Sequence, residues 1–318
     1  MAGEYNGGPR EASPEIAAAS PPRSLAQCLE RGPLVLDGAT GTELERRGVR
    51  SSLPLWSSHA LLEAQEQVRA VHAAYVRAGA RALTAATFRT QRRVLQRAGV
   101  RESPQALTER AVRLAREAAR EASSEKIFVL GSAPPLEDCY RPDLTPAEPE
   151  LAREHGDHAR NLVRAGVDAV LAETHPSVRE AVAAARAARE AGAPVLVSFV
   201  CWHGERLLSG EPLGDAIAAL QPFEPLAVGV NCLPPSNVAA CLPALQAAGR
   251  FLVYANLGKP DATTGFRHSE ACSPETFAAH AGRWLDAGAG LVGGCCGTTP
   301  AHLAAVAQLV AQRQALGS

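Results

Sequence analysis

Short apolar runs alternate with helix-like stretches along most of this 318-residue chain. Each run has the length and the β-branched or apolar content of a buried strand, and the stretches between them have helical spacing. The runs number eight and cover 34–36, 82–88, 127–130, 169–171, 195–200, 226–230, 251–254 and 290–292. Because strands separated by helices must pair in parallel through crossover connections, the alternation predicts an α/β fold.

Local signals mark where the intervening helices begin. Ser103, Ser273 and Thr299 are each followed by proline, which is the pairing of an N-cap residue with the first helical position. Ser177 with Glu180 three residues later has the spacing of a capping box. These signals predict four helix starts.

Eight strand–helix units over roughly 280 residues fit a closed barrel better than an open doubly wound sheet, although periodicity alone allows both. No G-x-G-x-x-G motif follows the first run, which disfavours a dinucleotide-binding sheet. The expected fold is therefore a single (β/α)8 TIM barrel over residues 24–318. Residues 1–23 are rich in Gly, Pro, Ser, Ala and Glu without a period, and we expect them to form a flexible N-terminal tail.

The charge balance and the cysteine content limit the partners and the compartment. Lys and Arg number 32 against 33 Asp and Glu, so no overall charge attracts nucleic acid or an anionic membrane. No secretory signal and no apolar stretch of membrane-spanning length occurs, which predicts a cytoplasmic protein without a membrane or nucleic-acid partner. In such a reducing compartment the eight cysteines are expected to be ligands, catalytic groups or buried small residues, not disulfides.

Polar residues at the carboxyl ends of barrel strands form the active sites of this fold. Asp37 follows the first run and Glu173 follows the fourth. Either carboxylate could hold an ammonium group or a metal, and Asp37 could instead cap the next helix. His175, two residues beyond Glu173, is expected to have a structural role.

Three cysteines lie at the ends of the sixth and eighth runs. Only the seventh run separates these two runs along the chain. Cys232 ends the sixth, and Cys295 and Cys296 end the eighth. Adjacent residues of a regular strand face opposite ways, but Gly294 and Gly297 permit a bend that turns both sulfurs inward. Three thiolates suit Zn²⁺ and leave a fourth position open, whereas the alternative is a buried Cys232 and an incidental vicinal pair. The remaining cysteines are expected only to fill space: Cys28, Cys139, Cys201, Cys241 and Cys272.

A zinc ion with three thiolate ligands is electron-rich and can keep a further bound thiol ionised at neutral pH. The substrate for the open position is therefore expected to be a small thiol, which attacks an alkyl carbon. Asp37 and Glu173 are placed to hold the ammonium group of an amino acid through charge-assisted hydrogen bonds.

Six segments resemble, in order, the zinc-dependent homocysteine S-methyltransferases, a family that includes S-methylmethionine:homocysteine and betaine:homocysteine methyltransferases. They are LDGATGTELERRG (36–48), AGARALTAATF (78–88), AETHPSVREA (172–181), VGVNCLPP (228–235), FLVYANLG (251–258) and VGGCCGTTPAHL (292–303). The resemblance implies a (β/α)8 barrel that makes methionine and holds Zn²⁺ on Cys232, Cys295 and Cys296, with the homocysteine sulfur as fourth ligand.

The resemblance also implies roles for three further residues. Asp37 and Glu173 match acidic positions that bind the homocysteine amino group, and Asn231 matches a position expected to orient ligands. The segments 85–89 and 131–141 depart from the family pattern, as does the segment that follows Tyr254. These loops are where a methyl donor would be recognised, so the resemblance fixes the donor less well than the zinc and homocysteine sites.

The donor must be an activated small molecule, because we expect neither a folate nor a cobalamin domain in this chain. S-methylmethionine or S-adenosylmethionine is preferred over betaine, since the first and sixth segments look closer to the S-methylmethionine enzymes. Phe88, Tyr140, Trp202 and Tyr254 are candidates for aromatic faces beside a cationic donor. The alternatives are a homocysteine module served by a separate corrinoid protein and a non-catalytic zinc- or thiol-binding barrel.

Overall fold

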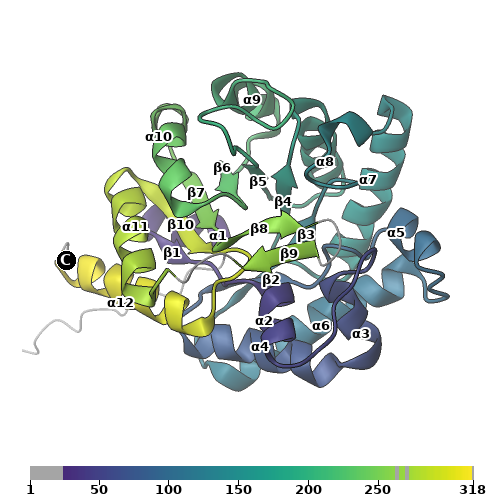
Figure 1. Cartoon of the computed structure of the whole chain (residues 1–318), viewed down its shortest axis with the longest axis horizontal. Coiled ribbons are helices and arrows are strands. Elements are labelled where there is room, and N and C mark those ends of the chain that lie inside the picture. Colours follow the sequence, from purple (N-terminus) through teal and green to yellow (C-terminus); the bar gives the residue numbers. More distant parts are fainter. Residues whose placement is uncertain (1–23, 262–264, 269–271, 317–318) are drawn as a thin grey trace, which may run out of the picture.

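The chain folds into a parallel barrel with helices around its outside (Figure 1). The structure is a computed structural model and describes residues 24–261, 265–268 and 272–316. The expected N-terminal tail, residues 1–23, lies outside the described residues. Among these residues, no helix combines the length and the apolar character needed to cross a lipid bilayer.

The barrel strands coincide with the eight apolar runs. They are β1 (Leu34–Val35), β2 (Ala82–Ala85), β3 (Phe128–Ala133), β4 (Ala169–His175), β5 (Val195–Phe199), β6 (Ala227–Asn231), β7 (Phe251–Ala255) and β10 (Ala289–Gly294). Their order in the sheet is β1-β10-β7-β6-β5-β4-β3-β2. A parallel bridge between Leu36 and Ala82 joins β1 to β2. The predicted (β/α)8 TIM barrel is confirmed.

Helices cover the outside of the barrel and connect its strands, except for α1, which precedes β1 (Figure 1). They are α1 (Leu25–Arg31), α2 (Thr40–Arg46), α3 (Ala60–Glu63), α4 (Gln65–Arg77), α5 (Arg92–Arg97), α6 (Pro104–Ala122), α7 (Glu148–Arg164), α8 (Val178–Glu190), α9 (Leu213–Leu220), α10 (Val238–Ala247), α11 (Pro274–Asp286) and α12 (Pro300–Leu316). Short 3₁₀ turns lie at Ser57–His59, Pro142–Leu144, Gln221–Phe223 and Pro235–Asn237. The predicted caps at Ser103 and Ser273 are confirmed, since each hydroxyl accepts a backbone N–H of the first turn.

The capping box predicted at Ser177 is wrong. Ser177 does precede α8, but its hydroxyl is buried and has no hydrogen-bond partner in the described part of the chain. The Glu180 carboxylate turns inward, where it accepts the Leu136 N–H at 2.8 Å and lies 3.3 Å from Nε2 of His155. Tertiary burial of Glu180 beneath the β3–α7 loop therefore overrides the local cap.

A second sheet, which the sequence pattern did not predict, follows β7. It is an antiparallel hairpin of β8 (Gly258–Asp261) and β9 (Gly265–His268). Its strands are short and carry polar residues such as Lys259 and Arg267, so they lack the apolar runs that identify the barrel strands.

Alternation along each strand builds two apolar layers. Phe128 and Leu130 of β3 belong to a cluster inside the barrel, whereas Val129 between them belongs to the larger cluster under the helices. Leu25 and Leu29 of α1 pack against the inner cluster. The barrel is thus filled by side chains, and its polar residues gather where the strands end.

Candidate metal centre and substrate cavity

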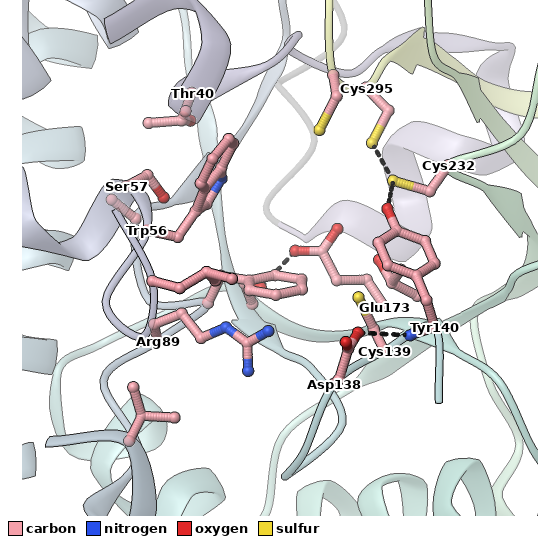
Figure 2. Close-up of a pocket in the computed structure, with 18 of the residues that line it drawn as sticks. Thr40, Trp56, Ser57, Arg89, Asp138, Cys139, Tyr140, Glu173, Cys232 and Cys295 are labelled. Carbon is pink, nitrogen blue, oxygen red and sulfur yellow. Dashed lines mark hydrogen bonds between the residues drawn. The ribbon is translucent and has the colours of Figure 1, made fainter. Parts of the chain in front are cut away.

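Three cysteine sulfurs converge at the carboxyl ends of β6 and β10. The Sγ atoms of Cys232, Cys295 and Cys296 all lie within 4.8 Å of one another, and those of Cys232 and Cys295 are 2.9 Å apart. Cys232 is buried and the other two are half-buried. Figure 2 shows this group at one side of the cavity.

Tight packing at Gly294 and Gly297 produces the turn that brings the vicinal cysteines together. A Cβ at Gly294 would lie 2.2 Å from Oγ1 of Thr298, and that hydroxyl donates to the Cys295 carbonyl at 2.7 Å. Gly297 has a φ of 86°, which L side chains rarely adopt. The sequence-based expectation that glycines turn both sulfurs inward therefore agrees with the geometry.

The sulfur group has the chemistry of a metal site. Tetrahedral Zn²⁺ with Zn–S bonds of about 2.3 Å requires sulfurs roughly 3.8 Å apart. The three sulfurs lie within 4.8 Å of one another, and binding would move those of Cys232 and Cys295 apart from their 2.9 Å separation. Three protein ligands leave one of four tetrahedral positions for a substrate, as in catalytic zinc sites. Cys232, Cys295 and Cys296 could therefore hold a metal ion.

Glu173 is a buried carboxylate on the cavity wall. It lies near the end of β4, where the Ser132 hydroxyl donates to Oε1 and the Tyr254 hydroxyl donates to Oε2 at 3.2 Å. Burial raises the pKa of Glu173 to about 7. Because burial deprives this carboxylate of water, an ammonium group bound beside it would stabilise its charged form.

Asp37 follows β1 and is also buried. Its Oδ2 accepts the Thr84 backbone N–H at 2.8 Å, so it ties the end of β1 to β2 and caps no helix. Burial raises the pKa of Asp37 well above its usual range, and the nearby charge of Glu173 adds to this shift. The charge of Glu173 therefore reaches the Asp37 carboxyl.

Asn231 lies at the end of β6 and is fully buried. Its Oδ1 accepts the backbone N–H of Thr174 at 3.0 Å and the hydroxyl of Ser198 at 2.8 Å, and its Nδ2 donates to Oγ1 of Thr174 at 2.8 Å. Thr174, to which Asn231 is bonded, and Cys232, which follows Asn231 in the chain, have φ values of 63° and 54°. Asn231 thus connects two unusual backbone positions, one next to Glu173 and one in the sulfur group.

An aromatic pair covers the Cys232 side of the cavity. The Tyr140 hydroxyl donates to Sγ of Cys232 at 3.5 Å, and its ring stacks on Trp202 with centroids 5.0 Å apart. The Trp202 indole N–H donates to the Cys232 carbonyl at 3.0 Å. Of the four aromatic candidates, Phe88 and Tyr140 line the cavity, whereas Tyr254 bonds Glu173 and Trp202 supports Tyr140.

The cavity has a volume of about 570 Å³ and includes the three cysteines and Glu173 in its wall. Trp56, Arg89 and Cys139 are among the lining residues that were not singled out from the sequence, although Arg89 and Cys139 lie in segments where a methyl donor was expected to be recognised. They lie in loops, where no periodicity indicates which way a side chain points. Burial raises the pKa of Cys139 to about 12, so this thiol stays protonated. His175 is buried against the Ala133 carbonyl at 3.2 Å, as expected of a structural histidine.

Barrel and site together define a homocysteine S-methyltransferase: the model of that family matches residues 34–310, and the chain belongs to the family. It is 35% identical over 292 residues to the homocysteine S-methyltransferase of Escherichia coli (strain K12), covering 86% of this chain and 94% of that one. The Bacillus subtilis (strain 168) homocysteine S-methyltransferase YbgG is 31% identical, with 86% and 93% covered. The crystal structure of the homocysteine methyltransferase MmuM from Escherichia coli, metallated form, superposes with a TM-score of 0.78 at 31% identity, covering 90% of this chain and 99% of that one.

Proposed function

We propose that this enzyme transfers a methyl group from an activated small molecule to the sulfur of homocysteine, giving methionine, and that it depends on Zn²⁺. S-methylmethionine or S-adenosylmethionine is the preferred donor. The observation that carries the proposal is the convergence of Cys232, Cys295 and Cys296 on a cavity that also contains the buried carboxylate of Glu173.

The three cysteines are the proposed zinc ligands. When bound, the ion would keep the homocysteine thiol ionised at neutral pH, whereas a free thiol with a pKa of about 8.5 is mostly protonated. The residues of the chain then have two tasks, to orient the amino acid and to align the donor.

Glu173 and Asp37 are the proposed partners of the homocysteine ammonium group. Glu173 lines the cavity, and Asp37 is close enough for the charge of Glu173 to raise the pKa of Asp37. An ammonium group between them would relieve this repulsion and favour both charged forms. Asn231 is proposed to act indirectly, because its hydrogen bonds go to protein groups at the ends of β4 and β5.

The transfer step conserves charge and atoms. The homocysteine sulfur forms a bond to the donor methyl carbon, the bond from that carbon to the sulfonium sulfur breaks, and its electron pair stays on the leaving thioether. The thiol proton is released to solvent. Phe88 and Tyr140, which line the cavity, are suited to stabilise the cationic donor through their ring faces.

Methionine as product assigns the enzyme to amino-acid biosynthesis. We place it in the cytoplasm, because a reducing compartment keeps the cysteine ligands as thiols, and all eight cysteines are free in the structure.

A direct test measures zinc content and methionine formation from homocysteine with S-methylmethionine, S-adenosylmethionine and betaine in turn. We expect one zinc per chain and turnover with a sulfonium donor. Cys232→Ser should lose both, while Cys28→Ser, a matched change at a half-buried cysteine of α1, should lose neither. Stoichiometric zinc and homocysteine binding without turnover of any small donor would contradict the proposed reaction.

A further inference from the structure

Arg89 places a positive charge in the wall of the substrate cavity. It follows β2, and Figure 2 shows its guanidinium pointing into the cavity toward the side where Asp138 and Tyr140 lie. The backbone holds it there, because the Arg89 N–H donates to Oγ of Ser58 at 3.2 Å. Its guanidinium also lies 5.1 Å from the centre of the Phe88 ring.

This arginine differs in its charge partners from the other two that line the cavity. Arg97 pairs with Glu137, and Arg141 pairs with Asp143. Arg89 has no carboxylate within ion-pairing distance among the side chains that the structure describes. Of the three arginines in the cavity wall, Arg89 is therefore the one whose charge a ligand could neutralise.

The hydrogen bonds of Arg89 are also incomplete. One Nη donates to the Glu137 carbonyl at 3.2 Å, but Nε is buried and has no partner within the described ranges. The Glu137 carboxylate is not available to it, because Arg93 binds that group at 2.6 Å and Arg97 binds it as well. A guanidinium with an unpaired N–H can donate two parallel hydrogen bonds to a planar, two-oxygen anion.

A positive group in the wall is unfavourable for a cationic donor unless the bound substrates also bring negative charge. We propose that Arg89 binds the α-carboxylate of an amino-acid substrate in this cavity. The inference rests on the proposed function, since homocysteine and an amino-acid sulfonium donor are the two sources of that carboxylate. Arg89 is a specificity residue that selects zwitterionic substrates over amines or sulfonium ions of the same shape.

The test compares each substrate with its analogue that lacks the carboxylate. For homocysteine the analogue is 3-aminopropanethiol, and for S-methylmethionine it is (3-aminopropyl)dimethylsulfonium. Arg89→Met is compared with the wild type and with Arg92→Met, a matched change at an exposed arginine outside the cavity. KM is measured for each compound, and calorimetry measures the Kd of homocysteine and of S-methylmethionine separately on the zinc-loaded protein.

Because Arg89→Met removes a charged hydrogen bond, we expect it to weaken the binding of one of the two amino acids by about 10- to 100-fold. The binding of the analogue without a carboxylate should stay unchanged. A change in the homocysteine constants assigns the carboxylate to homocysteine, and a change in the donor constants assigns it to the donor. Equal binding of acids and analogues by the wild type would overturn the inference, even if Arg89→Met failed to fold. Unchanged constants in a folded Arg89→Met would do the same. Absence of turnover with every donor would refute the proposed function, while calorimetry would still test Arg89.

Discussion

Asn231 and Thr174 are joined by two hydrogen bonds, one in each direction, across the ends of β6 and β4. The Thr174 N–H donates to Oδ1 of Asn231 at 3.0 Å, and Nδ2 of Asn231 donates to Oγ1 of Thr174 at 2.8 Å. Thr174 adjoins the carboxylate of Glu173, and Asn231 adjoins the thiol of Cys232. One buried amide therefore sets the spacing between the proposed ammonium site and the proposed metal site.

Replacing Asn231 with alanine should loosen both halves of the site. The change leaves a buried backbone N–H of Thr174 without its acceptor, which predicts a loss of about 1 to 3 kcal/mol in the free energy of unfolding. Zinc retention should fall as well, because Cys232 is the next residue. Urea unfolding and chelator competition measure the two effects, and a variant with wild-type values in both would show that the link is dispensable.

Glu173→Gln should weaken homocysteine binding without removing the metal. The amide keeps the shape of the side chain but loses the charge that pairs with ammonium, so we expect Kd to rise about 10- to 100-fold. Glu190→Gln, at an exposed position on α8, is the matched control and should bind normally. Titration calorimetry with homocysteine measures the change. Loss of zinc from Glu173→Gln would mean that the carboxylate serves the metal instead.

Gly294→Ala should disturb the metal site more than the fold. The new Cβ would meet Oγ1 of Thr298 at 2.2 Å, and Thr298 holds the Cys295 carbonyl, so the cysteine turn must shift. We expect chelators to remove zinc at least about 10-fold more easily. Gly214→Ala in α9 is the control, since nothing lies within 4 Å of its new Cβ and alanine favours a helix by about 1 kcal/mol. Equal zinc affinity in the two variants would contradict the role given to Gly294.

His72 should make the protein sensitive to acid. It is fully buried in α4, and neither ring nitrogen has a hydrogen-bond partner in the described chain. Burial lowers the pKa of His72 from 6.5 to about 4, so the unfolded chain takes up a proton that the folded state resists. The contribution of His72 is therefore complete above pH 6.5 and is lost as the pH falls from 6.5 toward 4, by up to about 3 kcal/mol.

His72→Leu removes that proton uptake and an unsatisfied polar group. We expect it to be at least as stable as the wild type at pH 7, with a shallower fall in the free energy of unfolding between pH 6.5 and 4. Unfolding by urea across this pH range measures the wild type and His72→Leu side by side, and an unchanged slope in His72→Leu would disprove the assignment.

The barrel could be predicted because burial on both faces makes each of its strands an apolar run. The meeting of Cys232 with Cys295 and Cys296 could be predicted for a related reason, since strand ends converge at one edge of a barrel and glycines mark the bend. The β8–β9 hairpin could not, because its residues are polar and its pairing is local. The Ser177 cap failed because Glu180 found partners far away in sequence.

The loop residues of the cavity show the same limit. Arg89 and Cys139 owe their positions to the paths of the loops after β2 and β3, which depend on contacts such as Arg89 with Ser58. No regular spacing in the sequence predicts where a loop places the side chains of Arg89 and Cys139. The cysteines proposed as metal ligands were thus accessible from the sequence, whereas the other groups of the cavity wall required the three-dimensional arrangement.

X-ray absorption at the zinc edge, with and without homocysteine, tests the central claim most directly. The expected result is a site with three sulfur ligands at about 2.3 Å that gains a fourth when homocysteine binds. A zinc-free protein would contradict the proposal, and so would a sulfur count that homocysteine leaves unchanged.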